Sequence, residues 1–246
     1  MQPSPPESRA AQHTCNRLIG SGVIAFAILF NVPFSILGAM FDYPDILRQP
    51  AGEVLDRFAQ GGASLVLTWY SFGLAALALV PVALALSITP SRLARFPALT
   101  IGAAIAGALA GVTQAIGLMR WVFAIPAIAA AHADPTATDQ QRLIAEAQFS
   151  LLNAWGGVAI GEHIGQLLTA LFVALLSVVL WREAARSTAT LGQATALMIA
   201  IGTGEGLALA LGCNGEVFSL LTIAGFLGLT AWLILCGIRL IRAPAL

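Results

Sequence analysis

Six long apolar segments constrain the fold of this chain more than any other feature. Each is at least as long as the ~20 residues that an α-helix needs to cross the hydrocarbon core of a bilayer. Apolar residues make up 58% of the chain and charged residues only 10%, whereas about 25% are charged in an ordinary soluble domain. The sequence therefore predicts an all-α integral membrane bundle within residues 17–246, with six transmembrane helices at about 18–41, 64–88, 97–129, 157–181, 190–211 and 217–237.

Three shorter segments fall outside these spans. Residues 1–16 are polar and contain three prolines, so they are predicted to form a disordered tail. Residues 51–60 place their apolar side chains on one face of a helix, and residues 138–153 begin with the capping-box pair Thr138 and Gln141. Both are predicted to be short amphipathic helices that lie in the external membrane interface.

The arginines predict the orientation of the bundle. All twelve cationic residues are arginines, and with six spans both termini lie on one side of the membrane. Cytoplasmic loops of membrane proteins carry an excess of positive charge, so the side with more arginines, which includes the tail and both termini, is predicted to be cytoplasmic. That side receives Arg9, Arg17, Arg92, Arg95, Arg182, Arg186, Arg239 and Arg242, whereas the other side receives Arg48, Arg57 and Arg142.

Composition and residue spacing argue against several functions. The formal net charge is zero, so the chain has no overall positive field that would hold nucleic acid. Its three cysteines form no CxxC pair, and no two histidines have the HExxH spacing of a zinc hydrolase. Glu162 and His163 are adjacent, so their side chains diverge by ~100° around a helix and do not easily bind one ion. The sequence therefore indicates no metal centre and no particular cofactor, and it disfavours an enzyme.

Three spans carry charged residues, which cost about 2.5–3.5 kcal/mol each at membrane depth. Arg120 lies about seven residues past the centre of the third span, and Glu205 lies about five residues past the centre of the fifth. Glu162 and His163 lie about six residues before the centre of the fourth span, which runs the other way. At ~1.5 Å per residue, all are predicted to lie roughly 8–10 Å to the outer side of the midplane. With polar residues of the same half, the candidate ligand or ion site comprises Arg120, Glu162, His163, Gln166, Glu205, Asn31 and Tyr70.

Glycines spaced four residues apart predict that the third, fourth and fifth spans pack closely. Small residues at this spacing let helix backbones approach each other. On the fourth span, Glu162, Gln166 and Thr169 follow at i, i+4 and i+7, and this polar face is expected to point into the bundle. The glycines are Gly107 and Gly111 on the third span, Gly157, Gly161 and Gly165 on the fourth, and Gly202 and Gly206 on the fifth.

Two interpretations of these intramembrane charges are open at this point. In the first, spans three to five enclose an outward-facing polar cavity that binds or moves a small ligand, an ion or a lipid headgroup. In the second, the chain is a non-catalytic accessory subunit of a larger membrane complex, and Arg120 pairs with Glu162 or Glu205 as structural glue. One arginine cannot fully neutralise two carboxylates, and this mismatch favours the first interpretation.

Four short motifs follow the tail, namely Asp42-Tyr43-Pro44-Asp45-Ile46-Leu47, Phe58, Trp69-Tyr70 and Gly161-Glu162. With them, most of the chain resembles an uncharacterised family of bacterial multi-spanning membrane proteins, which is catalogued only as a domain of unknown function. The resemblance implies a location in the bacterial inner membrane and the six-span topology, but it implies no activity. The expected partners are the lipid bilayer, a small ligand or cation, and another membrane protein.

Overall fold

The computed structural model describes the backbone of residues 6–242 and the side chains of residues 13–242, and every regular element in this part is helical. This agrees with the all-α prediction. In order, the elements are α1 (Pro6–Phe41), a 3₁₀ turn η1 (Asp45–Arg48), α2 (Ala51–Leu77), α3 (Leu79–Ser87), α4 (Pro90–Arg95), α5 (Pro97–Phe123), α6 (Ile125–Ala133), α7 (Asp139–Leu152), a π-helical segment η2 (Asn153–Ile164), α8 (Gly165–Arg182), α9 (Arg186–Gly202), α10 (Gly204–Ala210) and α11 (Glu216–Arg242).

Among the described residues, six helical segments are long and apolar enough to cross a membrane, which confirms the predicted number of spans. The start of the chain differs from the prediction. α1 begins at Pro6, so residues 6–16 are helical and do not form the expected disordered tail, while residues 1–5 lie outside the described residues. The segments are His13–Phe41, Ala51–Ser87, Pro97–Ala133, Asp139–Arg182, Arg186–Ala210 and Glu216–Arg242.

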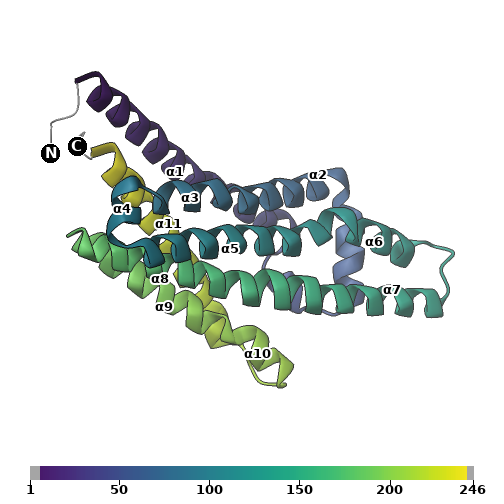
Figure 1. Cartoon of the computed structure of the whole chain (residues 1–246). Coiled ribbons are helices and arrows are strands. Elements are labelled where there is room, and N and C mark those ends of the chain that lie inside the picture. Colours follow the sequence, from purple (N-terminus) through teal and green to yellow (C-terminus); the bar gives the residue numbers. More distant parts are fainter. Residues whose placement is uncertain (1–5, 243–246) are drawn as a thin grey trace.

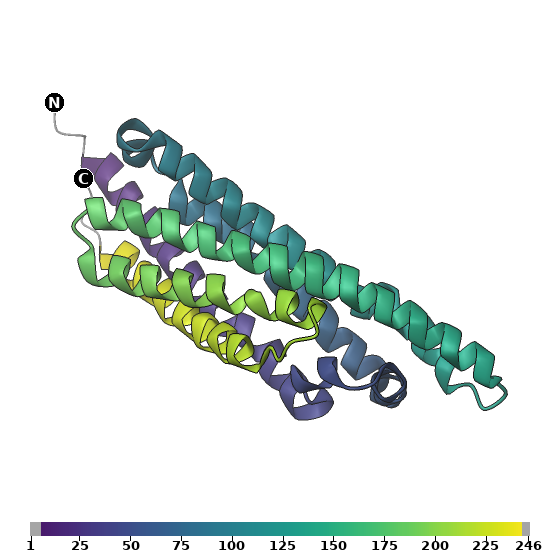
Figure 2. The same ribbon diagram turned by 90° about the horizontal axis from the view of Figure 1, so that it is seen from below.

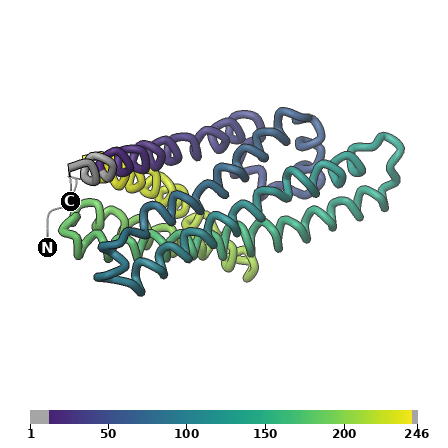
Figure 3. Tube along the Cα trace, turned by 45° about the horizontal axis from the view of Figure 1, so that its top comes forward, coloured from purple at the N-terminus to yellow at the C-terminus, as the bar shows by residue number. Residues whose placement is uncertain are grey.

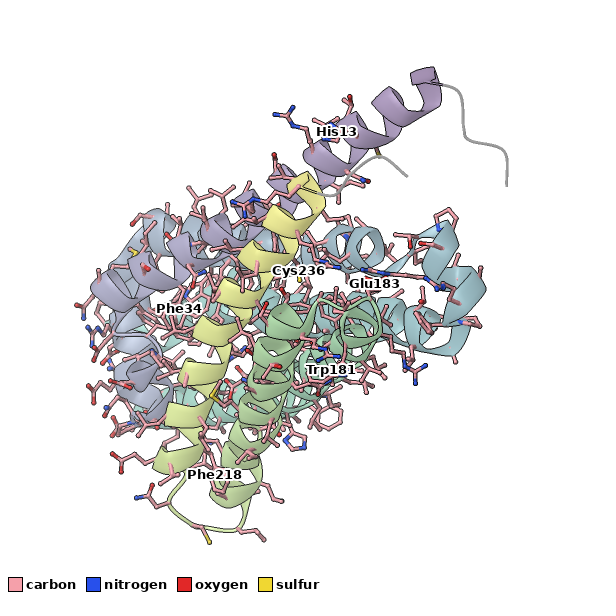
Figure 4. All side chains as sticks on the ribbon, turned by 90° about the vertical axis from the view of Figure 1, so that its left-hand side faces the viewer. His13, Phe34, Trp181, Glu183, Phe218 and Cys236 are labelled. Carbon is pink, nitrogen blue, oxygen red and sulfur yellow. The ribbon has the colours of Figure 1, made fainter. Side chains whose placement is uncertain are left out.

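The contacts between neighbouring helices arrange the six spans in a ring, which Figure 1 shows from the side. α2 and α3 pack between α1 and α5, α8 packs between α5 and α9, and α11 packs between α9 and α1. Figure 4, a view along the bundle, shows α11 lying between α1 and α9. α1 begins and α11 ends at the same end of the bundle (Figure 3), which we call the proximal end. The opposite, distal end carries the connections 42–50, 134–138 and 211–215.

A helical hairpin projects beyond the rest of the distal end (Figures 1 and 2). α5 continues into α6 through Ala124, and Asp139–Arg182 is helical throughout, from α7 through η2 into α8. The helix predicted at residues 138–153 is therefore the first part of the fourth span's own helix. The helix predicted at residues 51–60 is the first part of α2, which bends at Gly62, where φ is 59°.

Two clusters of buried side chains hold the ring together. The proximal cluster is largely aliphatic, and in it the ring of Phe172 meets that of Trp232 edge-on at 5.8 Å. The distal cluster is rich in aromatic residues, and Trp69 of α2 stacks on Trp121 of α5 with ring centroids 4.8 Å apart. Within a bilayer such contacts stabilise the fold through close packing, because lipid chains are as apolar as the protein core.

Candidate functional site

A cavity of about 210 Å³ lies inside the distal half of the ring. Its walls come mainly from α1, α5, η2 and α11, and the 42–50 connection contributes further lining residues. An apolar cavity of ~150 Å³ is large enough to hold a benzene molecule, so this cavity has room for a small ligand. One part of the wall is aromatic and the other carries charge, and the two parts are described in turn.

The apolar part of the wall is built from aromatic residues of three different helices. Phe30 of α1, Phe72 of α2 and Phe226 of α11 all line the cavity. Phe30 and Phe72 also contact each other, with ring centroids 5.4 Å apart. Aromatic rings offer large apolar contact surfaces, so this part of the wall suits a hydrocarbon or aromatic group.

The charged part of the wall is dominated by Arg48, a residue that sequence reasoning missed. Its Nη2 and Nε donate to Oε1 of Glu205 at 2.6 Å and 3.1 Å, and Nη2 lies 3.7 Å from Oε2 of Glu162. The side chains of Arg48, Glu162 and Glu205 are 33%, 28% and 17% exposed. Arg48 lies in η1, outside the apolar segments, so a search for charges within spans could not find it. The sequence offered one indication of a special role for Arg48, because it is one of only three arginines predicted on the outer side.

Arg120 does not form the ion pair that the structural interpretation expected. Its Nη2 donates to Oδ1 of Asn153 at 2.9 Å, and its Nη1 donates to the carbonyl of Gly117. The guanidinium lies over the ring of Trp121, 5.2 Å from the centroid, and its Nε is buried without a hydrogen-bond partner. A Cβ at Gly157 would collide with the guanidinium, so a glycine there makes room for it.

The charges that line the cavity balance each other. Arg48 and Arg120 carry two positive charges, and Glu162 and Glu205 carry two negative ones. The sequence-based argument from one arginine and two carboxylates is therefore wrong, because it omitted Arg48. The charges are nevertheless divided unevenly, since Arg48 faces both carboxylates while no carboxylate among the described residues lies within 4 Å of Arg120.

Glycines bring the helices of the site together. A Cβ added to Gly117 of α5 would lie 2.7 Å from the Cα of Gly161 in η2, and a Cβ on Gly161 would lie 3.0 Å from the Cα of Gly117. Gly165 likewise packs against Gln114 of α5. Gly202, by contrast, packs against α11, because α8 lies between α5 and α9 in the ring. Span four therefore packs directly against span three and against span five, whereas spans three and five are not neighbours. Span five packs against α11 on its other side.

Glu162 lies within η2, twelve residues of π-helix. A π-helix places one additional residue in each hydrogen-bonded turn, and such segments are frequent at functional sites. The side chain of Gln166, one turn later in α8, also lines the cavity. The polar face predicted on this span thus borders the cavity at Glu162 and Gln166, while Thr169 accepts a hydrogen bond from Gln114 at 2.8 Å.

His163 lies next to the main cavity, not in its wall. Its Nδ1 is 3.0 Å from the carbonyl oxygen of Thr203, the single residue between α9 and α10. A hollow of about 10 Å³ adjoins this contact and is also bordered by Glu162, Gln166 and Glu205. That volume is about the minimum that one water molecule requires.

The remaining predicted site residues are placed differently from one another. Asn31 of α1 lines the cavity, and its Nδ2 donates to the carbonyl of Ala27 and, at 3.1 Å, to Oγ1 of Thr230 on α11. Tyr70 is 40% exposed and does not line the cavity. The tyrosine of the wall is Tyr43, whose ring contacts that of Trp69. Burial, and secondarily the Glu162 carboxylate, raises the pKa of the Tyr43 phenol, so this group remains neutral.

Metal-ligand geometry is not found in the part of the chain that the structure describes. Among residues 13–242, no three His, Cys, Asp or Glu side chains are arranged so that they could hold a metal ion. The cavity therefore offers guanidinium, carboxylate, amide and hydroxyl groups as its polar contacts.

The fold and this site define a multi-pass, all-helical membrane protein with a partly charged cavity inside its bundle. Residues 18–237 match the family described as a domain of unknown function (DUF4386), and the chain belongs to this family. No curated protein and no solved structure matches the chain.

Proposed function

We propose that this protein binds a small amphipathic molecule with an anionic group in the cavity of its ring. The state of Arg120 is the observation that carries this proposal. Arg120 is one of the residues that line the cavity, its Nε is buried without a hydrogen-bond partner, and no carboxylate among the described residues lies within 4 Å of it. An unpaired cation at membrane depth is costly. The phosphate or carboxylate of a ligand would pair with it through charge-assisted hydrogen bonds.

The aromatic part of the wall supports an apolar body for the same ligand. Phe30, Phe72 and Phe226 offer ring surfaces without hydrogen-bonding groups. Ligand sites are mostly apolar, with a few polar groups that fix orientation, and this cavity has that distribution. The pair of Arg48 and Glu205 limits the cavity toward the distal end of the bundle.

Three detergents with the same alkyl chain test the proposal. The purified protein is titrated with dodecyl phosphate, dodecyltrimethylammonium and dodecyl maltoside, and thermal unfolding is followed by intrinsic fluorescence. Dodecyl phosphate is expected to raise the unfolding temperature saturably, because only its headgroup pairs with Arg120. Arg120→Leu is expected to weaken this binding roughly ten- to hundredfold, the loss of one charge-assisted interaction.

Two control variants accompany this titration. Arg120→Lys keeps the positive charge and is expected to retain part of the binding. Arg95→Leu changes an exposed arginine at the proximal end and is expected to bind dodecyl phosphate as the unaltered protein does. Equal binding of the cationic and the anionic detergent, or full binding by Arg120→Leu, would contradict the proposal.

In this proposal the protein resides in the bacterial inner membrane, with both termini in the cytoplasm and the cavity in the outer half of the bilayer. The excess of arginines at the proximal end supports this orientation. Cys213, exposed in the α10–α11 connection, and Cys15, exposed near the start of α1, provide the test. A membrane-impermeant maleimide is expected to label Cys213 in intact cells and Cys15 only after lysis. The reverse pattern would invert the topology.

The structural role stands as a second candidate because Arg48 joins the 42–50 connection to both η2 and α10. In an accessory subunit, these bonds would only hold segments of this chain together, and apolar packing between two leucines could replace them. The variant Arg48→Leu/Glu205→Leu would then leave complex formation intact in native gels, and no added amphiphile would bind to the unaltered protein. Binding of dodecyl phosphate would rule out this reading as a full account.

A further inference from the structure

The cavity wall is incomplete between α1 and α11. Leu227 and Ile223 of α11 and Phe34 of α1 all line the cavity, yet they are 64%, 41% and 37% exposed. Buried positions of α11 nearer the proximal end, such as Leu229 and Leu233, also line it. A side chain that borders an internal cavity and remains largely exposed lies at an opening. This opening is on the side of the ring that faces lipid, because α1 and α11 are membrane spans.

The two helices that flank the opening cross closely toward the proximal end. Gly20 and Gly237 cross so closely that a Cβ on Gly237 would lie 2.6 Å from the carbonyl oxygen of Gly20. Further toward the distal end, Asn31 of α1 donates a hydrogen bond to Thr230 of α11. Beyond it α1 turns toward α2 and α11 toward α10, and Figure 3 shows the two helices diverging.

From this geometry we infer that the ligand is a single-chain anionic lipid that enters the cavity from the bilayer through the opening between α1 and α11. The inference rests on the proposed function and specifies its ligand and route. Its phosphate or carboxylate pairs with Arg120, and the first part of its chain lies against the aromatic wall. The rest of the chain passes between Phe34 and Leu227 into the membrane.

The size of the cavity supports a chain that leaves through the opening. Benzene occupies a cavity of ~150 Å³, so a volume of 210 Å³ holds on the order of eight carbon atoms. A lipid chain is longer than this, and its remaining length needs an apolar exit. The charged end offers none, because Arg48, Glu162 and Glu205 lie there. The exposed apolar side chains of α1 and α11 do.

Tryptophan quenching by brominated lysophosphatidic acid tests this inference in vesicles. Trp69 and Trp121 are fully buried and line the cavity, so bromine quenches them when the chain enters. The exposed Trp155 and Trp181 are changed to phenylalanine first, because annular lipid would quench them as well. Bromine near the headgroup is expected to quench more strongly than bromine near the chain end. Inorganic phosphate in large excess is not expected to reverse the quenching.

Variants at the opening test the route. Ile223→Phe/Leu227→Phe enlarges two side chains at the opening and is expected to slow the onset of quenching roughly tenfold. Leu220→Phe is the matched control, because Leu220 is a leucine of the same helix with the same 64% exposure that does not line the cavity. It is expected to leave the rate unchanged.

The outcomes separate this inference from the proposed function. If dodecyl phosphate binds through Arg120 but the double variant and the Leu220→Phe control are quenched at equal rates, the lateral route is wrong and the binding function stands. Displacement by inorganic phosphate alone would identify a water-soluble anion as the ligand and would also overturn the inference. If neither dodecyl phosphate nor the brominated lipid binds, the proposed function itself fails.

Discussion

Arg48 donates two hydrogen bonds to one oxygen of Glu205, although the two residues are 157 positions apart in the chain. The contact fastens the connection after the first span to the end of the fifth. It also leaves the second oxygen of Glu205 without a contact to Arg48, while Glu162 stands 3.7 Å away. At the distal end of the ring, a single arginine therefore forms ion pairs with two carboxylates from different segments.

Replacing Arg48 alone is expected to destabilise the protein more than replacing Arg48 and Glu205 together. Arg48→Leu leaves Glu162 and Glu205 close together without a cation, whereas Arg48→Leu/Glu205→Leu leaves one carboxylate. Because Arg48 is about a third exposed, solvent screens the interaction, and we expect a loss of about 1 kcal/mol for the single variant. Thermal unfolding in detergent measures both. A double variant less stable than Arg48→Leu would show that the pair does not act as described.

The crossing of Gly117 and Gly161 predicts a strong effect of a single methyl group. Gly117→Ala places a Cβ 2.7 Å from the backbone of Gly161, so α5 and η2 must separate, at a cost of about 1–3 kcal/mol. Gly22→Ala is the control, because nothing lies within 4 Å of a Cβ at that position of α1. We expect Gly22→Ala to be neutral or slightly stabilising in the same thermal unfolding measurement. Equal stability of the two variants would contradict the close crossing.

His132 predicts how the projecting hairpin is held to α2. Its Nδ1 lies 2.9 Å from Oδ1 of Asp56 and its Nε2 lies 3.1 Å from Oε1 of Glu146, so the imidazole bridges the two carboxylates. His132→Leu is expected to cost about 1–2 kcal/mol, less than for a fully buried pair because Asp56 is largely exposed. Hydrogen exchange of residues 51–61 is expected to accelerate as this part of α2 detaches. The variant His13→Leu, far away in α1, is the control for loss of a histidine.

The turn between α6 and α7 predicts a local dependence on pH. The backbone N–H and hydroxyl of Thr136 donate to Oδ1 of Asp134 at 2.8 Å and 2.7 Å, and they hold the pKa of that carboxyl below its ordinary value. A depressed pKa means that the carboxylate supports the turn above its ordinary pKa. This support is lost as the pH falls through the lowered value. Thr136→Ala removes the hydroxyl but keeps the backbone N–H, which is the larger cause, so the pKa is expected to rise only part of the way toward its ordinary value in an NMR titration of labelled aspartate. An unchanged pKa would show that the hydroxyl does not contribute.

The number and order of the spans could be predicted from the sequence, because a run of about twenty apolar residues reports directly on the thickness of the bilayer. The depth of charged residues follows from the same count, and Arg120, Glu162 and Glu205 do border one cavity. Their pairing could not be predicted. It depends on how each helix is rotated about its axis, and rotation is set by packing between distant segments.

Trp69 and Tyr70 illustrate this limit. The two residues are adjacent on α2, but neighbouring side chains on a helix point ~100° apart. Trp69 is fully buried against Trp121, whereas Tyr70 is turned to the outside. Arg48 and Tyr43 reach the cavity from a connection whose path no helical periodicity describes.

The contact between α1 and α11 has a consequence for biogenesis. The first span leaves the ribosome long before the last, yet the two are neighbours in the finished ring. Until the final helix has been inserted, α1 and α9 each expose to lipid a flank that α11 later covers. The helices that wall the cavity are therefore all in place only after the last span has been inserted, at the end of translation.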